Sequence, residues 1–289
     1  MDNAYNNEDI KIKIEKVSVE GCGVIILTGP SSCGKGEIAK ELRRLLSISD
    51  DRHLSMGDIL RNTIDKARNN QSFREKLSND YHISDEISVF DSEHDGVAIY
   101  PKAKKYENDL KKFFNDQDII TQLDWLEFCV ANGLLIPDSW TVNIINATFE
   151  QSDDFGKNIY ILDGYPRTIK AAEELINVTL KMNVPIIKVI HLSITKNEMM
   201  KRALGRNRMD DDVVSLERRY QFYVDHVQPS IDYLKEQLGS DKVDLIDAHQ
   251  PIYNSQNEID LEKSVRQVAI DVLQSLGLPS YLLSVGSKS

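Results

Sequence analysis

The stretch "GVIILTGPSSCGKGEIAK" (residues 23–40) places an apolar run directly before a glycine-rich segment and a lysine. The run Gly23–Leu27 has the length of a buried strand, and a helical spacing of apolar residues follows the lysine. Gly29, Gly34 and Lys35 have the spacing of a phosphate-binding loop, in which backbone N–H groups, a helix N-terminus and a lysine surround phosphate oxygens. The stretch therefore predicts a strand, a phosphate-binding loop and a helix, and its glycine spacing excludes a dinucleotide fingerprint.

The composition of the chain narrows the class of protein. Its 289 residues can form one α/β domain with an inserted subdomain, or two small domains. A net charge of −11 argues against electrostatic binding to nucleic acid or to an anionic membrane. The 3 cysteines form no CxxC pair, which excludes a disulfide framework and a structural zinc site. The polar, acidic residues 1–16 do not resemble a signal peptide, and no apolar run reaches membrane-spanning length. We expect a soluble, cytoplasmic monomer.

Strand-length apolar runs alternate with segments of helical spacing. The runs are 24–27, 159–162, 186–192 and 243–246, and the helical segments are 37–46, 168–182, 212–237 and 261–276. Nearly continuous apolar strands that alternate with helices indicate an α/β fold, with a parallel sheet of about five strands covered by helices on both faces. Alternating apolar residues between Ile10 and Val19 predict an additional edge strand. Ligands of such sheets bind at the carboxyl ends of the strands.

Residues 62–124 interrupt this pattern. They are rich in Asn, Asp, Glu and Lys, and they read as an acidic, loop-like insertion. The part "EISVFDSEHDGVAIYP" (86–101) predicts a β-hairpin with its turn at Asp95 and Gly96. The insertion is either a surface for another protein or an ornament without a partner.

Three further stretches combine arginines with acidic residues: "LSMGDILR" (54–61), "LDGYPRT" (162–168) and "KRALGRNRMDDDVVSLERRYQFY" (201–223). Asp58 and Arg61 share a helix face, and Asp163 ends a strand four residues before Arg167. Each arginine taken alone is most simply a solvated surface residue. Behind a phosphate-binding loop, the set indicates a site for several phosphate groups.

These stretches resemble, in the same order, those of the adenylate kinase family of nucleoside monophosphate kinases. The counterparts are the phosphate loop (29–36), the Gly-Asp-x-x-Arg segment (57–61), the Asp-Gly-Phe-Pro-Arg segment (163–167, with Tyr165), the Arg-x-Asp-Asp segment (208–211) and the Gly-x-Leu-Val-Pro-Asp stretch (133–138). The resemblance covers about 22–61, 125–238 and, more weakly, 243–275. It implies a P-loop NTPase-type core (20–61, 151–203 and 217–278), a helical acceptor-binding arm (62–150) that carries the insertion at about 62–124, a short lid (204–216) without a zinc site, and an N-terminal extension (1–19).

The resemblance also implies Mg²⁺-dependent, reversible transfer from ATP to a nucleoside monophosphate, most simply ATP + AMP = 2 ADP. It assigns to ATP the residues Gly29, Ser31, Ser32, Cys33, Gly34, Lys35, Gly36, Glu37 and Arg202. It assigns to the acceptor Met56, Arg61, Ile136, Gly164, Arg167, Ala171, Arg208 and Arg219. It implies catalytic roles for Lys35, Asp163, Arg167, Arg202, Arg206, Arg208 and Arg219. No side chain would bind the metal directly, and Asp58 and Asp163 would orient its water molecules.

Several positions depart from the family pattern. Gly36 offers no hydroxyl to a metal ion, and Glu37 replaces a threonine, so we expect its carboxylate to face solvent. Met56 and Ala171 replace the side chains that usually read the acceptor base, which leaves CMP and UMP open beside AMP. Cys33 is a small loop spacer or a reactive thiol. Two alternatives also remain: a kinase of another small acceptor, and a nucleotide-binding protein without activity.

Overall fold

The structure is a computed structural model that describes residues 20–91, 99–152, 154–206 and 212–278. Its centre is a parallel sheet of 5 strands in the order β2-β3-β1-β4-β5. The strands are β1 (Gly23–Thr28), β2 (His53–Ser55), β3 (Ile159–Asp163), β4 (Ile186–Ser193) and β5 (Val243–Asp247). The predicted α/β class and parallel sheet are confirmed. Strand β2 has only 3 residues, too few for an apolar run, and the sequence analysis missed it. The predicted strand between Ile10 and Val19 lies outside the described residues.

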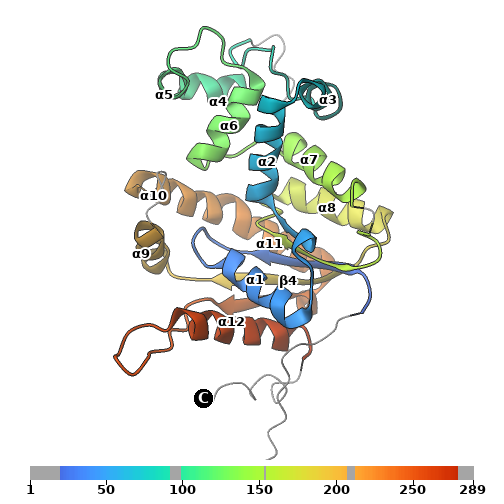
Figure 1. Ribbon diagram of the computed structural model, residues 1–289, viewed down its shortest axis with the longest axis vertical. Coiled ribbons are helices and arrows are strands. Elements are labelled where there is room, and N and C mark those ends of the chain that lie inside the picture. The colour runs from blue at the N-terminus through green and yellow to red at the C-terminus, as the bar shows by residue number, and fades with distance from the viewer. Residues whose placement is uncertain (1–19, 92–98, 153, 207–211, 279–289) are drawn as a thin grey trace, which may run out of the picture.

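Helices cover both faces of the sheet (Figure 1). Helices α1 (Lys35–Leu46) and α12 (Leu261–Ser275) pack on one face through a cluster that includes Leu27 and Ile190. Helices α8 (Ile169–Lys181) and α11 (Gln228–Leu238) pack on the other face, where Ile26 belongs to a second cluster. Because both faces of β1 are buried, all 6 of its residues are buried, which explains its unbroken apolar sequence.

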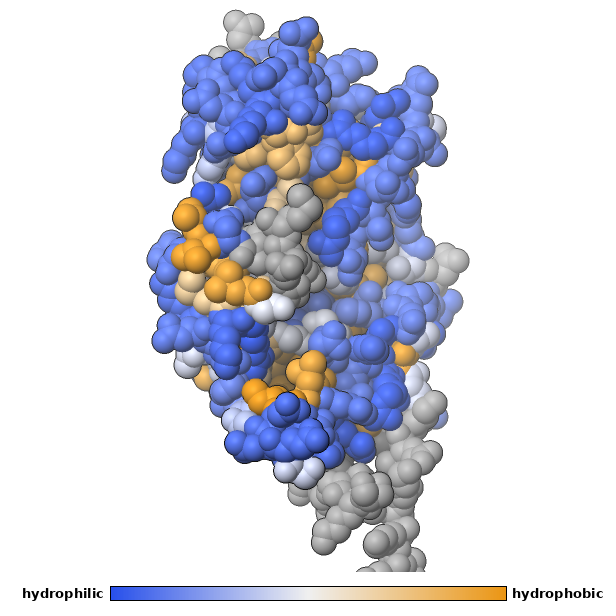
Figure 2. Space-filling view, turned by 60° about the vertical axis from the view of Figure 1, so that its left-hand side comes forward, coloured by the Kyte–Doolittle hydropathy of each residue, from blue (hydrophilic) through white to orange (hydrophobic). Residues whose placement is uncertain are grey.

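Helices α9 (Lys196–Arg206) and α10 (Val213–Phe222) flank residues 207–211, which the structure does not describe. A π-helical turn, Tyr223–Val227, joins α10 to α11, so the predicted helix 212–237 is continuous but changes its hydrogen-bond pattern within its length. Short 3₁₀ turns precede β2 and β5, at Asp50–Arg52 and Ser240–Lys242. Figure 2 shows the face that carries α9 and α10, where hydrophilic residues dominate and hydrophobic residues form separate patches.

The arm consists of helices. They are α2 (Met56–Asn69), α3 (Gln71–Tyr81), α4 (Tyr100–Lys105), α5 (Glu107–Phe113), α6 (Gln122–Asn132) and α7 (Asp138–Glu150). Helix α2 leads away from the sheet, and α3, α4 and α5 gather near its far end (Figure 1). The arm is therefore helical, as the resemblance implies. The loop-like composition of the insertion was misleading, because most of its described residues are helical.

The predicted hairpin at 86–101 is also wrong in its described part. Ser88 forms an isolated antiparallel bridge with Thr121, and α4 begins at Tyr100. Pro101 lies in the first turn of α4, where its fixed φ angle and missing N–H suit a helix. The proposed turn at Asp95 and Gly96 lies outside the described residues.

The arm and the sheet share one hydrophobic cluster. Leu77, Ile83 and Leu110 of the insertion belong to the cluster that also contains Val24 and Ile26 of β1. The insertion adds no strand to the sheet among its described residues. It is therefore an extension of the core on the side of α2, α6 and α7.

Candidate functional site

The phosphate loop connects β1 to α1. At Gly29, where φ is 140°, a Cβ atom would lie 2.2 Å from the carbonyl oxygen of Leu192, so only glycine lets the loop pass β4 this closely. Gly34 begins α1 in the left-handed region, with φ of 97°. Lys35 Nζ donates to the carbonyl oxygens of Gly29 at 3.1 Å and Pro30 at 2.9 Å. The lysine therefore folds back over the loop, with its ammonium beside the backbone cradle.

Cys33, Ser32 and Glu37 of the phosphate loop differ in how far they are buried. The side chain of Cys33 is only 1% exposed and packs in the cluster beneath the loop, which favours a spacer over a reactive thiol. Ser32 Oγ is buried without a hydrogen-bond partner in the described structure. Glu37 is exposed in the first turn of α1, as expected, and it borders the cleft beside the loop.

A cleft of about 800 Å³ opens beside the phosphate loop. Its lining includes the loop from Ser31 to Glu37, the ends of β2, β3 and β5, helix α9 and the first turns of α12. These elements meet because the carboxyl ends of parallel strands lie along one edge of a sheet. The cleft is large enough for a nucleotide-sized ligand.

A second cavity of about 230 Å³ lies between the phosphate loop and the arm. It shares with the cleft the residues Ser31, Lys35, Gly57, Arg61, Gly164 and Arg167. Arg219 of α10 also lines this cavity, and its Nε would lie 2.7 Å from a Cβ atom at Gly133, which ends α6. The loop lysine and two arginines thus lie where two cavities meet.

The two arginines at this junction are held differently. Arg61 donates from Nη2 to Asp58 Oδ1 at 2.6 Å, and this hydrogen bond lowers the pKa of Asp58. Both of these side chains are more than half exposed, at 57% and 64%. Arg167 donates from Nε to the carbonyl oxygen of Gly164 at 2.8 Å, and burial lowers its pKa although Asp163 opposes the shift. Arg167 is therefore held by the backbone at the junction, whereas Arg61 is largely exposed and paired with a carboxylate.

Asp163 ends β3 beneath the same junction. Only 10% of its side chain is exposed, and its Oδ2 lies 3.5 Å from Nε2 of His53, which begins β2. His53 Nε2 is buried and has no hydrogen-bond partner among the described residues. Within those residues, no group of three His, Cys, Asp or Glu side chains could hold a metal ion. A carboxylate with spare acceptor capacity fits a metal ion that is bound mainly through water and phosphate oxygens.

Met56, Ile136 and Ala171 lie together at the arm side of the junction. They border a third cavity of only about 20 Å³, with Leu60, Leu134, Leu135, Asp138, Thr141, Tyr165, Arg167 and Phe222. Nearby polar groups bond to one another: Tyr165 Oη donates to the carbonyl oxygen of Ala171 at 3.3 Å, and Thr168 Oγ1 donates to Asp138 Oδ1 at 2.7 Å. We call this space the base slot, and its walls are mostly apolar.

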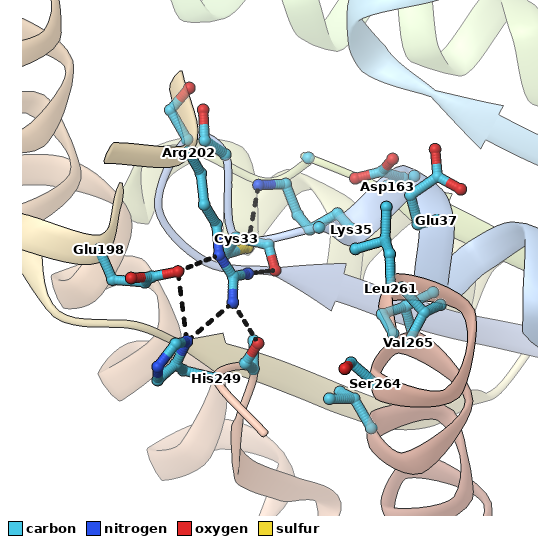
Figure 3. A pocket seen from close by; sticks show the side chains of 18 of the residues that line it. Cys33, Lys35, Glu37, Asp163, Glu198, Arg202, His249, Leu261, Ser264 and Val265 are labelled. Atoms are coloured by element: carbon cyan, nitrogen blue, oxygen red, sulfur yellow. Dashed lines mark hydrogen bonds and ion pairs between the residues drawn. The ribbon is translucent and has the colours of Figure 1, made fainter. Parts of the chain in front are cut away.

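Arg202 of α9 lies in a polar cluster at the cleft (Figure 3). It donates from Nε to Glu198 Oε1 at 2.8 Å and from Nη2 to the carbonyl oxygen of Ala248 at 3.1 Å, and His249 Nδ1 lies 3.1 Å from Nη2. Although burial opposes it, the hydrogen bond from Arg202 lowers the pKa of Glu198. The sequence analysis missed Glu198 and His249, but His249 lies two residues after the end of β5, near a strand end where ligands bind.

Two predicted lid residues cannot be compared with the site. Arg206 is the last residue of α9, and Arg208 lies outside the described residues. The structure brings together Lys35, Arg61, Arg167, Asp163 and Gly164, with Arg202 and Arg219 on the walls. In the described part of the chain, no helix combines the length and apolar character that crossing a membrane requires.

Comparisons with known proteins agree with this arrangement. A family model described as adenylate kinase matches residues 115–238. An adenylate kinase of Mycobacterium sp. (strain MCS) is 27% identical over 214 residues, which cover 74% of this chain and 87% of the relative. One of Alkaliphilus oremlandii (strain OhILAs) is 24% identical over 287 residues, covering 88% of this chain and 98% of the relative. The chain is therefore similar to adenylate kinases over most of its length, and the family model matches its residues 115–238.

Proposed function

We propose that the chain catalyses Mg²⁺-dependent, reversible phosphoryl transfer from ATP to a nucleoside monophosphate, with AMP as the first choice: ATP + AMP = 2 ADP. One observation carries the proposal. Lys35, Arg61 and Arg167 line both the cleft of about 800 Å³ and the cavity of about 230 Å³. Cations at the junction of two ligand cavities suit a reaction in which a phosphoryl group passes from one ligand to the other.

The donor would bind in the cleft. Its phosphates would accept hydrogen bonds from the backbone of the phosphate loop and from Lys35, which would exchange its two carbonyl partners for phosphate oxygens. Ser32 Oγ, which is buried without a partner, is a further group that a phosphate could satisfy. Arg202 would face the donor from α9.

The acceptor would bind in the second cavity, with its phosphate near Arg61 and Arg167 and its base against the apolar residues that border the base slot. A phosphate oxygen of the acceptor attacks the terminal phosphorus of ATP, the bond to the bridging oxygen breaks, and ADP leaves. Arg167 needs no rearrangement to stabilise the charge on the transferring group, because Gly164 already fixes it. Arg219, Arg206 and Arg208 would add charge on closure.

The family as a whole uses Mg²⁺ with ATP, and the metal neutralises phosphate charge when it is bound. In this chain, Asp163 would orient water molecules of the metal shell. Asp58 would contribute only after releasing Arg61. Glu37 borders the cleft as a second carboxylate.

The test is an ADP-formation assay with ATP, Mg²⁺ and a panel of AMP, CMP, UMP, GMP and their deoxy forms. The proposal expects ADP that depends on one of these acceptors. A CMP or UMP kinase is the second candidate, because the base slot offers few free polar groups to select adenine. Absence of acceptor-dependent ADP with every member of the panel would favour a nucleotide-binding protein without activity.

A further inference from the structure

We infer that His249 is a positioning residue for the donor, which holds the Arg202 guanidinium in place by accepting a hydrogen bond at Nδ1. The inference rests on the proposed function only in taking ATP as the donor. Neither His249 nor Glu198 belongs to the set of residues that the family resemblance assigns.

The first argument is the direction of the hydrogen bonds. A guanidinium can only donate, so the 3.1 Å contact between Arg202 Nη2 and His249 Nδ1 requires a free lone pair on Nδ1. The tautomer that meets this condition carries its proton on Nε2. Nδ1 also lies 3.2 Å from Glu198 Oε1, so a proton on Nδ1 would instead be donated to Glu198, and the contact with Arg202 would be lost.

The second argument is the number of elements that meet at this guanidinium (Figure 3). Glu198 lies one turn before Arg202 on α9, whereas Ala248 and His249 lie on the segment after β5, and Nη1 is 3.5 Å from the carbonyl oxygen of Cys33 in the phosphate loop. Glu198 fixes the side chain only relative to its own helix. The contacts with the segment after β5 fix it relative to the rest of the cleft.

The third argument concerns what Arg202 can still offer a ligand. Nε and Nη2 already donate to protein acceptors, so the guanidinium is poorly placed to bind a phosphate with two parallel bonds. Arg202 lines the cleft, where a planar ligand group can stack on a guanidinium face. Loss of the Nδ1 acceptor would allow this face to rotate, which weakens donor binding and leaves the acceptor cavity unaffected.

The experiment measures ATP binding to the full chain by calorimetry, without acceptor. His249→Leu removes the acceptor, and His249→Asn restores an oxygen at a similar distance from the backbone. Tyr253→Leu is the matched control, because its ring is 56% exposed in the same segment and does not line the cleft. We expect His249→Leu to weaken ATP binding roughly tenfold and the other two variants to stay within about twofold of the wild type.

Steady-state kinetics separate positioning from a general structural role. His249→Leu should raise the KM for ATP and leave kcat and the KM of the acceptor nearly unchanged. Equal ATP binding by His249→Leu and the wild type overturns the inference, as does an Asn variant as weak as the Leu variant. A wild type that binds ATP but transfers no phosphoryl group refutes the proposed function alone, because calorimetry still decides the role of His249. A wild type that binds no ATP overturns both.

Discussion

Arg167 is the single residue on which the proposed chemistry depends most. Burial lowers its pKa, it lines the cleft, the second cavity and the base slot, and its Nε donates to the carbonyl oxygen of Gly164. Arg167→Ala should reduce kcat about 10³-fold or more, as for other arginines that stabilise a transferring phosphoryl group. Arg167→Lys keeps the positive charge but lacks the planar guanidinium, so its kcat should lie between those of the wild type and Arg167→Ala. Steady-state kinetics with circular dichroism check this, and losses below tenfold in Arg167→Ala would contradict it.

His191, the sixth residue of β4, is a buried group that the proposed reaction does not use. Its Nε2 lies 2.6 Å from Tyr223 Oη in the π-helical turn. Burial lowers the pKa of His191, the charge of Lys35 adds to this shift, and Asp232 opposes it. Burial also raises the pKa of Tyr223 to about 12. The pair is therefore a neutral hydrogen bond that ties the helix to the sheet near neutral pH.

The lowered pKa of His191 has a consequence for stability. Because the unfolded chain binds the proton more readily, the free energy of unfolding should fall as the pH drops below the ordinary histidine value of about 6.5, by at most about 1.4 kcal/mol per pH unit. His191→Gln keeps a hydrogen-bonding group that does not titrate, so this part of the pH dependence should disappear. Urea unfolding at two pH values, above and below the histidine range, measures it. Identical pH dependence in both proteins would refute the assignment.

Among the elements, α2, α8 and α10 set the base slot. Met56 and Ala171 are each 1% exposed, and the slot holds only about 20 Å³ of free space. We expect the kcat/KM for AMP to exceed that for CMP or UMP by less than about 200-fold, because an apolar slot discriminates mainly by shape. Ala171→Gln alone should be impaired, since the longer side chain meets Met56. The double variant Met56→Thr, Ala171→Gln should make room for the glutamine and increase the ratio of kcat/KM for AMP to that for CMP or UMP. Wild-type discrimination above about 10⁴ would mean that another polar group reads the base.

The elements also show where sequence reasoning succeeds. Strands β1, β3 and β4 were predictable because burial on two faces requires an unbroken apolar run. The individual helices of the insertion could not be predicted from the apolar pattern, because they are short and bury few residues each. In α5, for example, only Leu110 is buried. The hairpin prediction failed because a turn-like dipeptide and alternating residues do not determine which strand partner exists.

Local sequence patterns likewise predict some residues of the candidate site and miss others. Lys35 and Arg167 were predictable because each lies at a fixed offset from a strand end. His249 lies at such an end too, but its role depends on Glu198 and Arg202, 51 and 47 residues earlier in the chain. Only the fold places these three side chains together. The small free volume of the base slot likewise depends on packing between α2 and α8, which no local pattern reveals.

For the whole molecule, the insertion and the donor cleft belong to different hydrophobic clusters. The cluster beneath α1 and α12 contains none of the described residues between 62 and 150. The insertion packs against α6 through aromatic rings. The ring centroids of Tyr106 and Trp125 lie 6.3 Å apart, and those of Phe113 and Phe128 lie 5.5 Å apart. Replacing residues 70–118 with a short linker should therefore lower thermal stability and acceptor affinity and leave ATP affinity nearly unchanged. Calorimetry and thermal unfolding check this, and complete loss of the fold would contradict it.

The most direct test of the account follows the phosphoryl group itself. ATP labelled at its terminal phosphorus is mixed with AMP, Mg²⁺ and an excess of enzyme, and the products are separated after a single turnover. The account predicts that the label appears in the terminal phosphate of ADP formed from AMP, with no inorganic phosphate, and that Arg167→Ala slows this step while ATP still binds. Label that appears only as inorganic phosphate, or remains in ATP with AMP, CMP, UMP and GMP alike, would contradict transfer between two nucleotides.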